Sequence, residues 1–133
     1  RDFREWALPY QRRAIEAVKG RVPVILFVLG GSAYLELLAA AGSDVISVDW
    51  RSELALARAT VGDAFALQGN LDPAVLFGPP DLVRARVVEA LESLGGQGHV
   101  FNVGHGLLPS TPRENVALLV ETVKTWRPGG ARP

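Results

Sequence analysis

The sequence predicts an α/β fold with one parallel sheet. Short apolar runs of strand type alternate with segments of helical periodicity, and glycine, serine or proline separates most of them. Repeated strand-helix units imply parallel strands, because each crossover helix returns the chain to the same edge of the sheet. With 133 residues, of which 48% are hydrophobic and 21% charged, the chain can bury a core. We therefore expect a single globular unit over residues 1–133.

A helix is expected first, over residues 9–19, because Gly20 follows a helical pattern there and favours its end. The nearly unbroken apolar run over residues 22–29 predicts a strand that is covered on both faces. Gly42 and Gly62 are the expected stops of the next two helices. The remaining elements are, in order, a helix over 33–41 capped by Ser32, a strand over 44–50, a helix over 53–61 capped by Ser52, a strand over 64–68, a helix over 81–94 after Pro79-Pro80, a strand over His99–Val103 and a helix over 112–126 capped by Thr111.

Polar residues follow every predicted strand, and this favours a barrel over an open, doubly wound sheet. A barrel gathers the loops at the carboxyl ends of its strands around one axis, whereas an open sheet uses a single crevice. Four strand-helix units make half of an eight-stranded barrel, and the leading helix is expected to end a preceding unit. Together with the missing initiator methionine, this predicts a C-terminal half-barrel whose N-terminal half belongs to a longer polypeptide. The polar clusters are Gly30-Gly31-Ser32, Asp49-Trp50-Arg51, the stretch from Gln68 to Pro73, and the stretch from Asn102 to His105.

Composition excludes several classes of function. Fourteen basic and fourteen acidic side chains give a net charge of zero, which argues against nucleic-acid and membrane partners. The chain has no cysteine, so it has no thiolate nucleophile and no cysteine-bound zinc. No apolar run reaches the roughly 20 residues of a spanning helix, and no secretory segment is visible. We expect a cytoplasmic protein.

The most informative motif places His105 between two glycines just after the last predicted strand. In a parallel α/β protein, the loops after the strands carry the chemistry, and flanking glycines let the backbone turn sharply or approach a ligand. His105 is therefore a candidate binding residue. The alternative is that its imidazole only satisfies backbone groups of the loop.

Asp49, Asn70 and Asn102 are weaker candidates, expected to support the site rather than to touch a ligand. Each follows or ends a predicted strand, but each could equally hold a loop through hydrogen bonds to the backbone. The same scaffold role is expected for Gln68 and Asp72, and the Gly30-Gly31-Ser32 turn lacks the spacing of a phosphate loop. His99 is expected to be solvent-exposed at the opposite end of the sheet. Trp6, Trp50 and Trp126 are expected to anchor the core or an interface.

Three motifs resemble the uroporphyrinogen decarboxylase family, and they stand in the order and spacing of its C-terminal half. They are the stretches from Asp44 to Trp50, from Ala66 to Pro73 and from Phe101 to Gly106; the opening residues 3–19 and the closing residues 109–123 are similar to the family too. The resemblance implies a (β/α)8 barrel, a homodimer, and an enzyme of tetrapyrrole synthesis. That enzyme removes four acetate carboxyl groups from uroporphyrinogen to give coproporphyrinogen, and it uses no metal and no organic cofactor.

The resemblance also implies which site residues this chain carries. The arginine loop, the pyrrole-binding aspartate, and the tyrosine and serine or threonine of the family would all lie before Arg1, so no principal catalytic residue is expected here and the chain alone should be inactive. His105 matches the family's substrate-binding histidine. Two alternatives remain open. The first is a zinc- or cobalamin-related methyltransferase of the same barrel type, which the absence of cysteine disfavours. The second is a half-barrel that binds a partner without catalysis.

Overall fold

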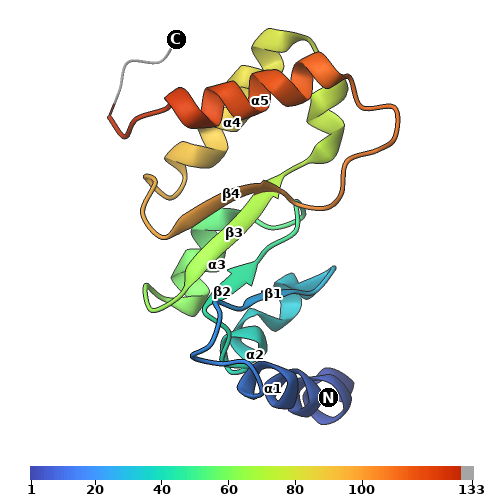
Figure 1. Ribbon diagram of the computed structural model, residues 1–133, viewed down its shortest axis with the longest axis vertical. Coiled ribbons are helices and arrows are strands. Elements are labelled where there is room, and N and C mark those ends of the chain that lie inside the picture. The colour runs from blue at the N-terminus through green and yellow to red at the C-terminus, as the bar shows by residue number, and fades with distance from the viewer. Residues whose placement is uncertain (130–133) are drawn as a thin grey trace.

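Four parallel strands form one sheet in this computed structural model, which describes residues 1–129 (Figure 1). Their order in the sheet is their order in the chain, as the repeated strand-helix pattern predicts. Leu26, Ile46 and Leu67 are neighbours in the register, so the strands start level with one another. The strands are β1 (Ile25–Phe27), β2 (Val45–Ser47), β3 (Ala66–Leu71) and β4 (His99–Val103).

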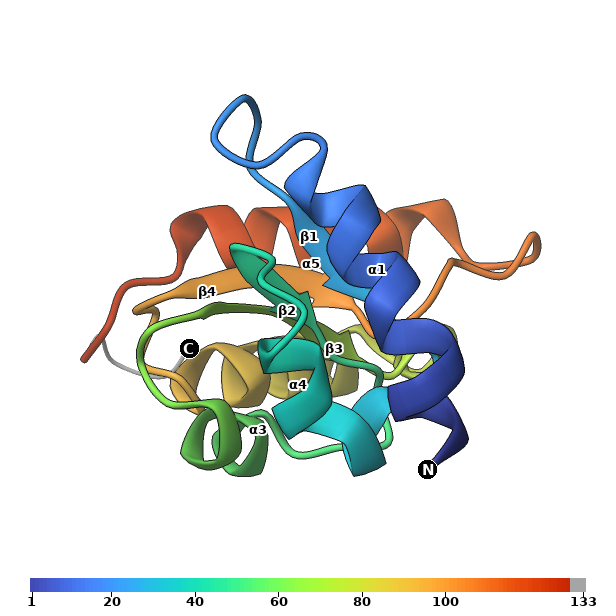
Figure 2. The same cartoon turned by 90° about the horizontal axis from the view of Figure 1, so that it is seen from below.

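Helices precede, connect and follow the strands, and four of them lie at the two ends of the molecule's long axis. The N-terminal helices α1 and α2 lie at one end, and α4 and α5 pack on each other at the other end (Figures 1 and 2). None of the helices in residues 1–129 has the length and apolar character needed to cross a bilayer. They are the π-helix η1 (Phe3–Ala7), α1 (Leu8–Glu16), the 3-10 helix η2 (Gly31–Tyr34), α2 (Leu35–Ala39), α3 (Leu54–Val61), the 3-10 helix η3 (Pro73–Phe77), α4 (Pro80–Glu92) and α5 (Arg113–Thr125).

Three apolar clusters pack the helices against one face of the sheet, and the third joins Leu8 and Ile15 of α1 to Leu26 of β1. In the first cluster, Ile46 and Leu67 are fully buried against side chains of α2 and α3, which include Leu38 and Ala57. In the second, Leu71 of β3 packs with the apolar faces of α4 and α5. Most of the buried apolar side chains lie on this face of the sheet. Burial of each leucine or isoleucine stabilises the fold by roughly 1.5–3 kcal/mol.

The opposite face of the sheet, which we call the open face, has no helix over it among residues 1–129. One row of it runs across all four strands through Phe27, Ser47, Gln68 and Val100. The outer members of this row are exposed, Phe27 to 42% and Val100 to 43%, whereas Ser47 at the centre is buried. A parallel sheet with helices on one face only, and exposed apolar side chains on the other, is the arrangement of half a (β/α)8 barrel.

The structure corrects the predicted first strand. Only Ile25–Phe27 of residues 22–29 is extended in the sheet, and Ile25 and Phe27 point to the open face, so this strand is not covered on both faces. An apolar run signals two apolar faces, but it does not say whether this chain covers both of them.

Three predicted serine or threonine caps are also wrong. Ser32 lies inside η2, whose N-cap is Gly30 at φ +71°, and Ser52 lies one residue before Glu53, the N-cap of α3. Pro112, rather than Thr111, occupies the cap position of α5. The hydroxyls of Ser32 and Ser52 instead contact each other and join the loops after β1 and β2.

His99 is not the exposed loop residue that its glycine neighbour suggests. It is the first residue of β4, half-buried, and its Nε2 lies 2.7 Å from the carbonyl oxygen of Gly69. Its Nδ1 is buried with no hydrogen-bond partner. Burial lowers the pKa of His99, and the nearby Arg58 guanidinium lowers it further, although the Gly69 hydrogen bond opposes both effects.

We expect the 133-residue chain to associate through the open face. The exposed apolar side chains and the unpaired edges of β1 and β4 both favour contact with another surface. Phe27→Ser should weaken association about 10-fold or more, because burial of a phenylalanine contributes roughly 1.5–3 kcal/mol. Sedimentation velocity over a concentration series measures this. Phe77→Ser is the matched control, since Phe77 is 44% exposed on η3, away from the open face; an equal effect of both changes would contradict the expectation.

Protonation of His99 should destabilise the fold at acid pH. The pKa of His99 in the folded chain lies below its ordinary value of 6.5, so the unfolded state takes up the proton first as the pH falls. The stability that neutral His99 contributes is therefore complete above pH 6.5 and is lost as the pH drops through the folded pKa. His99→Gln keeps an amide donor for Gly69. In this variant, the free energy of unfolding, measured by urea titration, should change less with pH between 7.5 and 5 than in the wild type. A pH dependence that survives unchanged in His99→Gln would refute this assignment.

Candidate functional site

The loops that follow the four strands meet at one end of the sheet, which we call the mouth. The mouth comprises Gly30 to Tyr34 after β1, Val48 to Glu53 after β2, Asp72 after β3, and Gly104 to Thr111 after β4. Because parallel strands end at the same edge, Asp49, Asn70 and His105 lie at this common end, as the sequence predicts. The contacts between these loops show how the site is built.

Asp49 is the anchor of the mouth. Its side chain is completely buried, and its carboxylate accepts hydrogen bonds from the backbone N–H of Gly30 at 2.6 Å and of Arg51 at 3.0 Å. These two bonds tie the loop after β1 to the loop after β2. Buried carboxylates need such partners, since desolvation of an unpaired charge costs several kcal/mol. Of its two expected roles, Asp49 visibly performs the structural one.

Asn70 continues the same network from the next strand. Its side-chain amide donates to the carbonyl oxygens of Asp49, at 2.9 Å, and of Ser52. Gln68 donates to Ser47 at 3.0 Å, and Asp72 accepts from the N–H of Ala74 at 2.9 Å. These are the side-chain hydrogen bonds expected of scaffold residues.

Asn102 lies apart from this network. It pairs with Asn70 in the register of β3 and β4, but its side chain is exposed and accepts only from the N–H of Val103, at 2.8 Å. The four candidates are therefore not gathered around one point. The buried Asp49 and the half-buried Asn70 form a scaffold, whereas Asn102 and His105 are exposed near it.

Gly104 brings the loop of His105 onto the loop of Asp49. Its N–H donates to the carbonyl oxygen of Leu71 at 2.7 Å, and a Cβ at this position would overlap the backbone nitrogen of Trp50 and lie 2.9 Å from the carbonyl carbon of Asp49. Only glycine permits this approach. As a result the imidazole of His105 meets the Trp50 indole edge to face, with 5.7 Å between ring centroids.

His105 itself is exposed, and neither of its ring nitrogens has a hydrogen-bond partner among residues 1–129. The alternative that its imidazole holds the loop through backbone hydrogen bonds therefore has no bond to support it. Both nitrogens are available to a ligand that enters the mouth.

Sequence reasoning passed over Arg51. Its guanidinium lies 4.5 Å from the centroid of the Trp50 ring, and one of its terminal nitrogens lies 3.5 Å from the Asp49 carboxylate. Trp50 thus contacts a guanidinium and an imidazole, from loops 54 residues apart in the sequence. One sequence signal was available: Arg51 is the only lysine or arginine among the mouth residues defined above.

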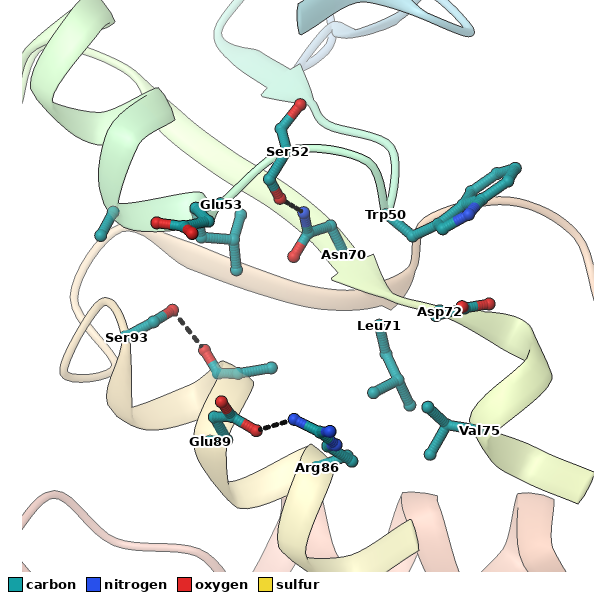
Figure 3. Close-up of a pocket in the computed structure, with 13 residues that line it drawn as sticks. Trp50, Ser52, Glu53, Asn70, Leu71, Asp72, Val75, Arg86, Glu89 and Ser93 are labelled. Carbon is teal, nitrogen blue, oxygen red and sulfur yellow. Dashed lines mark hydrogen bonds and ion pairs between the residues drawn. The ribbon is translucent and has the colours of Figure 1, made fainter. Parts of the chain in front are cut away.

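A groove of about 530 Å³ lies between α3 and α4 and shares Trp50, Ser52, Glu53 and Asp72 with the mouth (Figure 3). Arg86 and Glu89 of α4 form an ion pair in its wall at 2.8 Å. The Trp50 indole points away from α4, and neither His105 nor Arg51 lines the groove. Its lining residues are Trp50, Ser52, Glu53, Leu54, Ala55, Asn70, Leu71, Asp72, Val75, Arg86, Glu89, Ala90 and Ser93.

The mouth presents a guanidinium, Arg51, and an exposed imidazole, His105, both in contact with Trp50. Guanidinium and imidazole N–H groups donate to carboxylates, and an adjacent aromatic face favours a flat ligand. Within residues 1–129, no three histidine, aspartate or glutamate side chains lie close enough together to hold one metal ion.

Comparisons with known proteins agree with one another. Residues 1–126 match the model of the family described as "Uroporphyrinogen decarboxylase (URO-D)". The chain is 48% identical over 126 residues to a uroporphyrinogen decarboxylase of Synechococcus sp. strain JA-2-3B'a(2-13), covering 92% of this chain and 36% of the relative. It is 44% identical over 134 residues to the enzyme of that name from Nostoc punctiforme, covering 98% of this chain and 38% of the relative.

A solved structure has the same fold. The chain resembles a methyltransferase from Methanosarcina mazei with a TM-score of 0.80 and 28% identity, over 92% of this chain and 36% of that one. The chain thus spans less than two fifths of the length of the proteins it matches. On the family match over residues 1–126, the chain belongs to the uroporphyrinogen decarboxylase family.

Proposed function

We propose that this chain supplies one side of the active site of an enzyme that decarboxylates the acetate groups of uroporphyrinogen. Membership of the family carries the proposal, and the exposed imidazole of His105 in the mouth is the feature of the site that supports it. The substrate would be a tetrapyrrole with eight carboxylates, and the product coproporphyrinogen.

The reaction explains what the chain has to provide. Loss of carbon dioxide from an acetate leaves an electron pair, which a pyrrole can accept once one of its carbons is protonated, so the substrate serves as its own electron sink. The protein must hold the carboxylates, deliver a proton and stabilise the resulting cation. In this chain, His105 would bind or protonate near a substrate carboxylate, while Asp49 and Asn70 hold the loops in place.

The wider setting is part of the same proposal. We infer a cytoplasmic homodimer whose reaction needs no metal and no organic cofactor, and which binds neither nucleic acid nor membranes; the net charge of zero supports the last point. The methyltransferase alternative rests on a likeness of 28% identity, against 48% for a relative named as a decarboxylase. The third alternative, a half-barrel without catalysis, is an outcome of the experiment below.

A chimera tests the function directly. The segment of the Synechococcus relative that aligns with residues 1–126 is replaced by this chain, and coproporphyrinogen formation is measured by chromatography. We expect turnover within about 10-fold of the parent enzyme, and none from the 133-residue chain alone, because the family's principal catalytic residues have no counterpart in it. A second chimera in the Nostoc punctiforme relative guards against a faulty junction. Two folded chimeras without product would contradict the proposal and favour the binding module.

His105→Asn in the active chimera should lower turnover and let partly decarboxylated intermediates accumulate, without unfolding the protein. Asparagine keeps hydrogen-bonding capacity but cannot carry a proton. The expected loss is on the order of 10- to 1,000-fold, equivalent to about 1.4–4 kcal/mol of transition-state stabilisation. Steady-state kinetics and the melting temperature are measured on the same preparation.

Two glycine variants distinguish the effect of the position of His105 from the effect of its imidazole group. Gly104→Ala keeps the imidazole but pushes the loop away from Trp50, so it should also reduce turnover. Gly106→Ala meets nothing within 4 Å and should behave as wild type. Normal kinetics with a lowered melting temperature in His105→Asn would remove His105 from the site.

A further inference from the structure

We propose that Arg51 is a second carboxylate-binding residue of the mouth, acting with His105, and that both side chains contact Trp50. The inference rests on the proposed function, since it takes a substrate carboxylate as the ligand. It adds a specific residue, a positioning role and a geometry that the family match does not supply.

The contacts of Arg51 leave most of its hydrogen-bond donors free. Asp49 already accepts two backbone hydrogen bonds, and the guanidinium lies 3.5 Å from its carboxylate, which is long for a charge-assisted hydrogen bond. The Arg51 side chain is 54% exposed, and no hydrogen bond joins its guanidinium to any residue in 1–129. A guanidinium has five N–H donors, so most of them face solvent.

The Arg51 and His105 side chains are pre-organised by their contacts with Trp50. Stacking on the Trp50 ring restricts the rotamers of a long side chain, and this reduces the entropy that a ligand must overcome when it binds. Gly104 packs against the backbone nitrogen of Trp50, where a side chain on residue 104 would overlap it. The guanidinium and the imidazole therefore have fixed positions around one indole before any ligand arrives.

The charged residues around Arg51 leave its guanidinium accessible to an anion. Asp49 is buried beneath Arg51 and offsets part of its charge, but its carboxylate is not accessible to a ligand. The other two acidic residues of the mouth, Glu53 and Asp72, line the groove between α3 and α4. With Arg51 as the only lysine or arginine of the mouth, an anion has one cationic side chain to meet there, next to the imidazole of His105.

The test uses the chimera and two readouts. Binding of uroporphyrin, the oxidised and fluorescent form that carries the same carboxylates, is measured by fluorescence anisotropy at several salt concentrations. Turnover of uroporphyrinogen is measured in parallel. For Arg51→Gln we expect a roughly 10-fold rise in Kd and KM, a smaller change in kcat, and a shallower dependence of Kd on salt. Arg51→Lys should recover part of the affinity, because it keeps the charge but not the planar fork.

Arg86→Gln is the matched control. Arg86 is 53% exposed and is also paired with a carboxylate, but it stands on α4, outside the mouth. It should leave Kd and KM unchanged. A loss of affinity in Arg86→Gln would place the ligand in the groove between α3 and α4 and overturn the proposal. Equal losses in Arg51→Gln and Arg51→Lys, accompanied by a lower melting temperature, would also overturn it, because they indicate a structural role.

The two proposals fail differently. If the chimera forms coproporphyrinogen and Arg51→Gln matches wild type in Kd, KM and salt dependence, only the role of Arg51 is refuted. If the folded chimera binds uroporphyrin but forms no product, the proposed function fails, and the Kd series still decides whether Arg51 binds carboxylates.

Discussion

The mouth depends on the burial of one carboxylate. Asp49 has no contact with solvent, so its charge is tolerable only while Gly30 and Arg51 donate their backbone N–H groups to it. That requirement fixes the loops after β1 and β2 relative to each other. Asn70 then fixes them to β3 by donating to the carbonyl oxygens of Asp49 and Ser52. This network therefore positions the loops after β1 and β2, including Arg51.

Gly104 brings the loop after β4 against the loops that Asp49 holds together. The loop after β4 can reach Trp50 only because Gly104 has no Cβ, and this approach brings the imidazole of His105 to the indole. The neighbouring glycine on the other side, Gly106, has open space where a Cβ would lie. The two glycines that flank the histidine therefore differ in purpose. One permits a close backbone approach, whereas the structure imposes no such demand on the other.

The sequence predicted the architecture better than the details of the site. The order and direction of the strands follow from strand-helix periodicity, and His99–Val103 has the expected bounds. The first strand was mispredicted because an apolar run reports hydrophobicity, not which surfaces this chain covers. The scaffold role of Asn70 was predictable from its loop position, but the joint contact of Trp50 with Arg51 and His105 was not. It requires the curvature of the sheet and the absence of a side chain at Gly104, neither of which has a local sequence signal.

Binding and assembly are separable properties of this chain. Hydrogen bonds within residues 1–129 join the loops that carry Arg51 and His105 to the sheet. The open face differs, since Phe27 and Val100 are exposed and gain stability only when another surface packs on them. The order of the mouth is thus built locally, through polar contacts between loops. The stability of the assembled fold depends on burial of apolar area on the open face. Substitutions on the open face should therefore leave the mouth largely unchanged, and substitutions in the mouth should have little effect on association.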